Sequence, residues 1–213
     1  MELFYSPMAC SLASRIAVYE TGAENQIRFV EIDPKTKQTL GGEDYRAIYQ
    51  LGLVPLLRFE DGSLLSENAA ILQFLAGADP ESRLAPIDPL GRAHLQQWLC
   101  FIGTELHKAL FIPLFDTKGP PGLREHTLAK QESRLAFLGK HLEGREYLLD
   151  RFTVADAYLF TVLNWAMPTR LDLSRWPAIQ AYHKALQTRP AVARATAEEF
   201  ALYQAEVARH RAI

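Results

Sequence analysis

The chain has 213 residues, of which 48% are hydrophobic and 23% charged, as is ordinary for a soluble globular protein. Its net charge of -2 argues against a nucleic-acid partner and against an anionic membrane surface. Charges interrupt every long apolar run and no signal-peptide pattern opens the chain, so no membrane segment is predicted. The only cysteines, Cys10 and Cys100, favour a reducing, cytoplasmic setting over a disulfide framework.

Strand and helix signals alternate over residues 1–79 in the order β-α-β-α-β-β-α. The patterns predict strands at 2–5, 27–32, 56–59 and 63–65, helices at 10–20 and 69–76, and a weak helix near 42–50. Asp61-Gly62, between the last two strands, is a strong β-hairpin signal.

Cys10 stands where the first predicted helix begins, after Ser6 and Pro7 end the first strand. Free backbone N–H groups and the positive end of the helix dipole favour thiolate at such a place, so Cys10 is a candidate reactive cysteine. The alternative is a small buried hydrophobic residue, as most free cysteines are. Cys100, inside an apolar helix, is expected to react more slowly.

Strand signals vanish after Asp79-Pro80, and the composition of Ala85 to Pro89 is that of a linker. Apolar residues then recur every three or four positions, which predicts one long amphipathic helix through 95–110. Further helices are expected at 128–142, 153–165, 176–188 and 191–208. The sequence thus predicts an α/β domain at 1–79, a linker at 80–89 and an all-helical domain at 90–213.

Two short motifs lie at strand boundaries in the first domain. Val54-Pro55 starts a strand, either as an ordinary trans proline or as a cis bond that turns the Val54 main chain toward a ligand. In Ser66-Glu67-Asn68, spacing favours Ser66 as the N-cap of the next helix. The alternative is a binding site for the ends of a peptide-like ligand, where a carboxylate holds an ammonium and helix N–H groups hold a carboxylate.

Two motifs in the helical domain have a structural and a functional interpretation. His107 lies beside the apolar stripe of the long helix, and the residues alone favour a boundary histidine. Thr153-x-x-Asp156 fits a capping box that opens an apolar, buried helix, so both residues are expected to be structural. The few Cys and His residues predict no zinc or other metal site.

These motifs together resemble the glutathione S-transferase superfamily, and within it the bacterial beta class. The segments that carry the resemblance span essentially the whole chain: 4–13 around Cys10, Val54-Pro55, 65–68, 104–108 around His107, and 152–160 with the capping box. The resemblance implies an α/β thioredoxin-like N-terminal domain plus an all-α helical C-terminal domain. It also implies a cytoplasmic homodimer with a role in detoxification.

The resemblance further assigns residues to glutathione. It implies that Val54-Pro55 is cis and that the Val54 main chain pairs with the cysteinyl part. Glu67 and Asn68 match positions that hold the γ-glutamyl end, although Ser is commoner than Asn at position 68. Lys35 matches a lysine that contacts the glycyl carboxylate.

The resemblance also assigns the groups near the reacting sulfur. Cys10 matches a cysteine that lies beside the glutathione sulfur and can form a mixed disulfide with it. His107 matches a histidine that the helical domain contributes near the same sulfur. Phe111, Phe115 and Trp165 are candidates to line the site of the second substrate, with core packing as the alternative for each.

The leading hypothesis is therefore a glutathione transferase that conjugates the glutathione thiolate to small apolar electrophiles, with glutathione as co-substrate. The first alternative is a glutathione-dependent thiol–disulfide reductase that uses Cys10, and a secondary peroxidase activity is also considered. The second is a non-enzymatic binding or regulatory module on the same fold.

Overall fold

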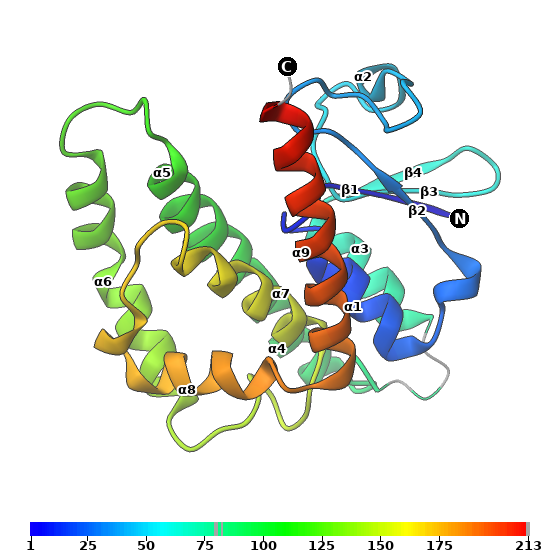
Figure 1. The fold of residues 1–213 in the computed structure, drawn as a ribbon. Helices are drawn as coiled ribbons and strands as arrows, with labels where there is room; N and C mark the ends of the chain where they lie inside the picture. Colours follow the sequence, from blue (N-terminus) through cyan, green and yellow to red (C-terminus); the bar gives the residue numbers. More distant parts are fainter. Residues whose placement is uncertain (79–80, 82, 212–213) are drawn as a thin grey trace. The chain divides into compact units, whose positions relative to one another are not determined.

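A computed structural model describes residues 1–78, 81 and 83–211 of the chain (Figure 1). The internal contacts divide the chain into two compact units. One consists of Met1–Leu84 together with Pro190–Ile213, and the other of Ala85–Arg189.

The first unit is built on a four-stranded sheet. Its elements are β1 (Glu2–Tyr5), α1 (Leu12–Thr21), η1 (Glu24–Gln26), β2 (Arg28–Glu31), α2 (Tyr45–Ile48), β3 (Leu56–Arg58), β4 (Leu64–Ser66), α3 (Asn68–Gly77) and α9 (Pro190–Arg211). The strand order is β2-β1-β3-β4, with β1 parallel to β2 and antiparallel to β3, and β4 antiparallel to β3. The predicted β-α-β-α-β-β-α order and the thioredoxin-like arrangement are confirmed.

The β3–β4 hairpin follows from its turn residues. Gly62 has φ +83°, which glycine adopts without steric cost, and its N–H donates to the Phe59 carbonyl at 3.1 Å. The Phe59 N–H donates to the Ser63 carbonyl at 2.9 Å and closes the turn. The Asp61-Gly62 signal therefore predicted the hairpin correctly.

Helix α9 packs along α1 in this first unit, where α1 also packs against α3 (Figure 1). The sequence placed the helix at 191–208 in the helical domain, and the contacts divide the chain differently. A buried ion pair explains the difference, because Arg15 on α1 donates to Glu199 on α9 at 2.9 Å. The expected boundary at Asp79-Pro80 lies outside the described residues, and the contacts place the division after Leu84.

The second unit is helical throughout its described part. It contains α4 (Pro89–Phe101), η2 (Ile102–Phe111), α5 (Ile112–Phe115), α6 (Leu123–Leu142), α7 (Val154–Leu163), η3 (Asn164–Ala166), η4 (Leu173–Arg175) and α8 (Pro177–Leu186). The expected long helix exists as the continuous stretch α4-η2-α5, but its centre, η2, is a π-helix. Such segments are rare and frequently mark functional sites.

This 27-residue stretch, Pro89–Phe115, is long and apolar enough to cross a membrane by length and composition alone. The core helix of a soluble protein passes the same test. Here η2 packs against α6 and α7, as a core helix does.

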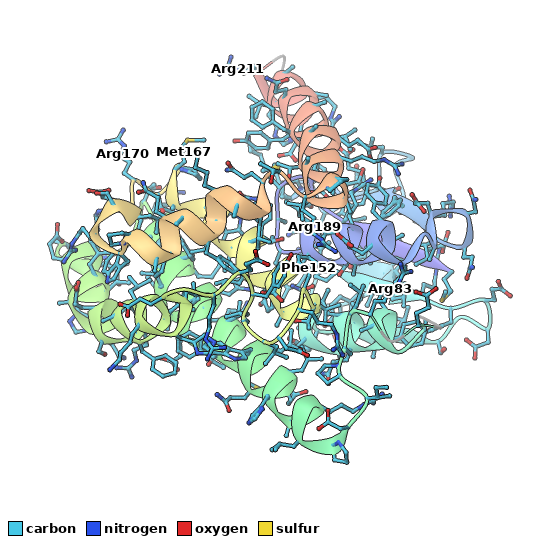
Figure 2. The ribbon with its side chains drawn as sticks, turned by 90° about the horizontal axis from the view of Figure 1, so that it is seen from below. Arg83, Phe152, Met167, Arg170, Arg189 and Arg211 are labelled. Carbon is cyan, nitrogen blue, oxygen red and sulfur yellow. The ribbon has the colours of Figure 1, made fainter. Side chains whose placement is uncertain are left out.

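Helix α7 is the buried centre of the second unit, and all ten of its residues are buried. Asp156 closes the predicted capping box, since its Oδ2 accepts from the Thr153 N–H at 2.8 Å and from the Thr153 hydroxyl at 2.9 Å. Just before the box, Phe152 lies beneath the Arg189 guanidinium, 4.0 Å from Arg189 Cζ to the ring centroid (Figure 2). The capping-box geometry is thus present as predicted.

Candidate active site

The turn between β1 and α1 presents Cys10. Helix α1 begins at Leu12 with Ser11 as its N-cap, two residues later than predicted, so Cys10 lies in the preceding turn. Its thiol donates to the Val54 carbonyl at 3.1 Å, and only 9% of the residue is exposed. Cys10 is therefore buried, as expected of a cysteine that packs as a small hydrophobic residue. It also lies against the Val54 main chain, which is a candidate ligand-binding group.

The Val54-Pro55 peptide bond is cis and directly precedes β3. Of the two alternatives that the sequence left open, the trans form is wrong. Cys10 Sγ and the Val54 main chain thus meet at the start of β3.

Helix α3 begins at Asn68, and its N-cap is Glu67. The prediction that Ser66 is the N-cap is wrong, because Ser66 is the last residue of β4 and the chain enters the helix through Glu67. Glu67 has φ +71°, a left-handed conformation that is costly for a residue with a Cβ. Its side chain is exposed. Backbone strain of this kind persists at ligand clamps, where the surrounding structure over-determines it.

Asn68 ties α3 to the Cys10 turn. Its Nδ2 donates to the Cys10 carbonyl at 3.2 Å, and its Oδ1 accepts from the Ser14 hydroxyl at 3.2 Å. The residue is buried, with 6% exposed. The Asn68 side chain therefore holds the Cys10 turn through hydrogen bonds, a structural role that the sequence did not predict.

His107 lies in the π-helix of the second unit and is buried, not at the boundary that the residues alone favoured. Its Nδ1 is 2.7 Å from the hydroxyl of Tyr158 on α7. Burial, with a smaller effect of Lys108, lowers the His107 pKa to about 4, so the ring is neutral at pH 7. Because a phenol is the better acid and imidazole nitrogen the better acceptor, we assign the Tyr158 hydroxyl as donor and the His107 proton to Nε2.

Aromatic rings surround Trp165 in the same unit. Ring centroids lie 4.9 Å away for His107, 5.8 Å for Phe111 and 5.8 Å for Phe115, all edge-on. Phe111 is fully buried, so core packing is its role, whereas Phe115 is 42% exposed.

Met167, which is 79% exposed, projects from the surface close to Arg170 (Figure 2).

Two family models match the chain: the glutathione S-transferase N-terminal domain over residues 7–78 and the C-terminal domain over residues 104–190. The glutathione S-transferase GstA of Escherichia coli O157:H7 is 40% identical over 201 residues, which are 93% of this chain and 98% of the relative. The chain belongs to the glutathione S-transferase family. The transferase is also 33% identical to GST-4.5 of Xanthomonas campestris over 197 residues, 85% of this chain and 90% of the relative.

Solved structures support the same assignment. BphK, a bacterial glutathione transferase in a ternary complex, has TM-score 0.88 and 41% identity over 93% of this chain and 99% of its own. A sphingomonad glutathione S-transferase in complex with glutathione has TM-score 0.86 and 40% identity over 93% of this chain and 98% of its own. A beta-class enzyme from Sphingomonas chungbukensis has TM-score 0.86 and 38% identity, with the same coverage. The protein is a glutathione transferase similar to the bacterial beta class, and the leading prediction is confirmed at this level.

Each unit of the transferase brings part of the predicted site together. Cys10, Val54 and Asn68 meet in the first unit, and His107 and Trp165 meet in the second. The pairing of Cys10 with His107 stays a prediction. Over residues 1–78, 81 and 83–211, no group of three or more Cys, His, Asp or Glu side chains is arranged to hold a metal ion.

The sequence did not reveal two basic side chains, Lys37 and Arg46, that lie beside Gly52, shortly before Val54. The Lys35 residue is exposed, and its backbone N–H donates to Asp33 Oδ1 at 2.9 Å. Lys37 and Arg46 instead lie against Gly52, where an added Cβ would come within 3.6 Å of Lys37 Cδ and 3.3 Å of Arg46 Cγ. Burial and Arg46 lower the Lys37 pKa, with Asp33 opposing. The signal in the sequence was Gly52 itself, because a glycine in such a loop marks close approach of other groups.

The two cysteines differ in exposure. Cys100 is exposed on α4, where it accepts from Gln96 Nε2 at 3.1 Å, and Cys10 is buried. The expectation that Cys100 reacts more slowly, because nothing in its helix favours thiolate, stays a prediction.

Proposed function

We propose that this transferase joins the sulfur of glutathione to small apolar electrophiles. The glutathione thiolate attacks an electrophilic carbon, a C–S bond forms, and a leaving group such as halide departs with its bonding electrons. Binding places the sulfur and the electrophile in contact, which converts a bimolecular step into an intramolecular one. The observation that carries the proposal is the contact of Cys10 Sγ with the Val54 carbonyl, next to the strained start of α3.

Glutathione is proposed to bind along the first unit. The exposed Glu67 carboxylate takes its ammonium, and the N–H groups at the start of α3 take its α-carboxylate. The main chain of Val54 takes the cysteinyl part. Lys35 is the predicted partner of the glycyl carboxylate, and Lys37 and Arg46, the cations beside Gly52, are further candidates for it.

The second substrate is proposed to lie on the helical unit. Trp165 lies edge-on to His107 and to the exposed Phe115, and the exposed Met167 adds apolar surface in the same unit. A neutral His107 that carries its proton on Nε2 can donate a hydrogen bond to a sulfur anion without adding charge to the site. Small apolar electrophiles fit the aromatic rings of Phe115 and Trp165 and the side chain of Met167.

Glu67→Ala tests the glutathione site. Loss of a charged hydrogen-bond partner costs about 1.5–3 kcal/mol, so glutathione binding should weaken at least about tenfold in calorimetry. The matched control is Glu60→Ala, which removes another exposed carboxylate of the first unit, in the β3–β4 turn. Equal affinity of both variants and the wild type would exclude Glu67 from the site.

Cys10 makes a disulfide reductase activity the second candidate function, because its thiol lies at the proposed cysteinyl position. The Cys10 thiolate would attack the glutathionyl sulfur of a mixed disulfide between glutathione and a substrate thiol, break that S–S bond and release the substrate thiolate. The thiolate of a second glutathione would then attack the disulfide on Cys10, form oxidised glutathione and regenerate the Cys10 thiolate.

Cys10→Ala separates the two activities. We expect the variant to keep conjugation, since the glutathione sulfur is the nucleophile there, and to lose disulfide reduction. Native mass spectrometry of the wild type with oxidised glutathione should show one added glutathionyl group on the peptide that contains Cys10. If conjugation and reduction both vanish while glutathione still binds, Cys10 serves both reactions.

The transferase is further proposed to act in the cytoplasm as a homodimer. Its first unit exposes apolar side chains that a second copy could cover, Leu64 at 43% and Phe74 at 36%. Light scattering after gel filtration should give twice the chain mass of 24.0 kDa, and a monomer mass would contradict the dimer.

A further inference from the structure

The turn that carries Cys10 contains a strained residue. Met8 has φ +60°, a left-handed conformation that is uncommon for a residue with a Cβ. The turn closes on itself through Ser6 and Ser11: the Ala9 N–H donates to the Ser6 carbonyl at 3.1 Å, and the Ser11 hydroxyl donates to the same carbonyl at 3.2 Å. Neither bond holds the Met8 N–H, which points out of the turn to another element.

The Met8 N–H donates to Glu199 Oε2 at 2.8 Å. Glu199 lies on α9, 191 residues further along the chain, and its side chain is fully buried. A hydrogen bond from a backbone N–H to a carboxylate is charge-assisted and stronger than one to a neutral acceptor. The C-terminal helix therefore reaches back to the residue that shapes the Cys10 turn.

The other oxygen of Glu199 is also occupied. Its Oε1 accepts from Arg15 Nε at 2.9 Å, and the Arg15 guanidinium lies over the rings of Tyr5 (4.5 Å) and Phe29 (4.0 Å). Burial raises the Glu199 pKa to about 7, and Arg15 and the Met8 N–H oppose that rise. Arg15 thus fixes the carboxylate from α1 while its second oxygen holds the turn.

We propose that Glu199 is a positioning residue for Cys10. Its hydrogen bond to Met8 keeps the turn in the left-handed conformation that buries the Cys10 thiol against the Val54 carbonyl. The functional meaning rests on the proposed role of Cys10, but the test below measures the thiol directly. A failure of this proposal is therefore distinguishable from a failure of the proposed function.

Glu199→Gln is the primary variant. Glutamine has nearly the same shape, but one of its two terminal atoms is an NH2 donor, so it cannot present an acceptor at both of the positions that face Arg15 and Met8. Release of the turn should expose Cys10 and free its thiol from Val54. We expect the alkylation rate of Cys10 by a neutral maleimide at pH 8 to rise at least about threefold relative to Cys100. The exposed Cys100 is an internal reference, read by peptide mass mapping of the same sample.

The matched control is Glu198→Gln, the same chemical change one residue earlier on α9. Glu198 contacts Tyr19 and Arg194, lies 3.6 Å from Arg15 Nη1, and is on the more exposed side of the helix, with 40% of its side chain exposed. This control therefore changes the charge beside Arg15 but leaves the bond between Glu199 and Met8 in place. It should leave the ratio of Cys10 to Cys100 alkylation unchanged.

A rescue variant separates positioning from a general structural defect. Glycine adopts a positive φ without steric cost, so Met8→Gly added to Glu199→Gln should return the alkylation ratio to within about twofold of wild type. Loosening of α9 elsewhere would not be repaired by a change at position 8. An unrescued double variant therefore overturns the proposal.

If Glu199→Gln does not fold, the double variant Arg15→Met with Glu199→Met replaces the buried pair by apolar chains of similar length, which proteins often tolerate. It lacks an acceptor for Met8 and should show the same rise in the Cys10 ratio. A wild-type ratio in either folded variant would overturn the proposal.

Discussion

The protonation state of His107 decides what the ring could offer the glutathione sulfur in the proposed reaction. A charged imidazolium would attract the thiolate strongly, whereas a neutral ring offers a single N–H donor. The buried position of His107 disfavours the charge, and its pKa of about 4 keeps the ring neutral through the physiological range. Its usefulness then depends on which nitrogen carries the proton, and the Tyr158 hydroxyl at 2.7 Å from Nδ1 determines that.

Tyr158→Phe removes this determinant with little change in shape. We expect the conjugation kcat/KM to fall about three- to tenfold, since one hydrogen bond is worth about 0.5–1.5 kcal/mol. Nitrogen-15 NMR of the histidine ring should change from the Nε2–H tautomer to a mixture of both.

Tyr203→Phe, on the exposed part of α9, is the control and should behave as wild type. A Tyr158→Phe enzyme with unchanged rate and an unchanged tautomer would show that Tyr158 does not set the state of His107.

At the scale of single elements, α7 depends on one carboxylate. Asp156 accepts four hydrogen bonds: two from Thr153, one from the Leu148 N–H at 2.8 Å and one from the Tyr182 hydroxyl at 2.7 Å. Burial raises its pKa, and these donors oppose the rise. The residue thus joins the start of α7 to the loop before it and to α8.

Asp156→Ala should lower the free energy of unfolding by at least about 2 kcal/mol, because it removes the cap and leaves buried donors without an acceptor. Urea titration measures the loss, and turnover per folded molecule should stay near wild type. Asp150→Ala, an exposed carboxylate in the preceding loop, should leave stability unchanged. A stable Asp156→Ala protein without turnover would assign Asp156 a catalytic role.

Elements whose signals are local were predictable from the sequence. The β3–β4 hairpin depends on adjacent turn residues, and the capping box on a spacing of three. The π-helix around His107 was not predictable, because the apolar spacing of three and four fits an α-helix equally well. Ser66 was taken for the N-cap because sequence preference cannot reveal that Glu67 adopts a left-handed conformation. The place of α9 escaped prediction because Arg15 and Glu199 are 184 residues apart.

For the whole molecule, two buried histidines make stability depend on pH. Burial lowers the pKa of both His107 and His183 to about 4, below the value of 6.5 for an exposed histidine. The unfolded chain then binds more protons than the folded one at acidic pH. Their contribution to stability is fully present above pH 6.5 and is lost as the pH falls through 4.

We therefore expect these two histidines to lower the free energy of unfolding by up to about 4 kcal/mol between pH 7 and pH 5, at about 1.4 kcal/mol per pH unit for each. The raised pKa of Glu199, about 7, opposes this fall over the same range, because the folded chain then binds more protons at that carboxyl than the unfolded chain does. His183→Gln, whose amide can still donate to Asn164, should remove about half of this slope. His126→Gln, on the exposed face of α6, should not alter it. A His183→Gln slope equal to that of wild type would show that His183 does not titrate as expected.

The first unit is assembled from two stretches of chain that are separated by the entire second unit. On the ribosome, residues 85–189 emerge before α9 is made, so the helical unit can complete its fold first. Until α9 arrives, Arg15 lacks its buried counter-ion and Met8 lacks its acceptor. The Cys10 turn is then among the last parts of the protein to mature, although it is among the first to be synthesised. A nascent chain can thus contain a folded helical unit while Glu199 does not yet hold the turn that carries Cys10.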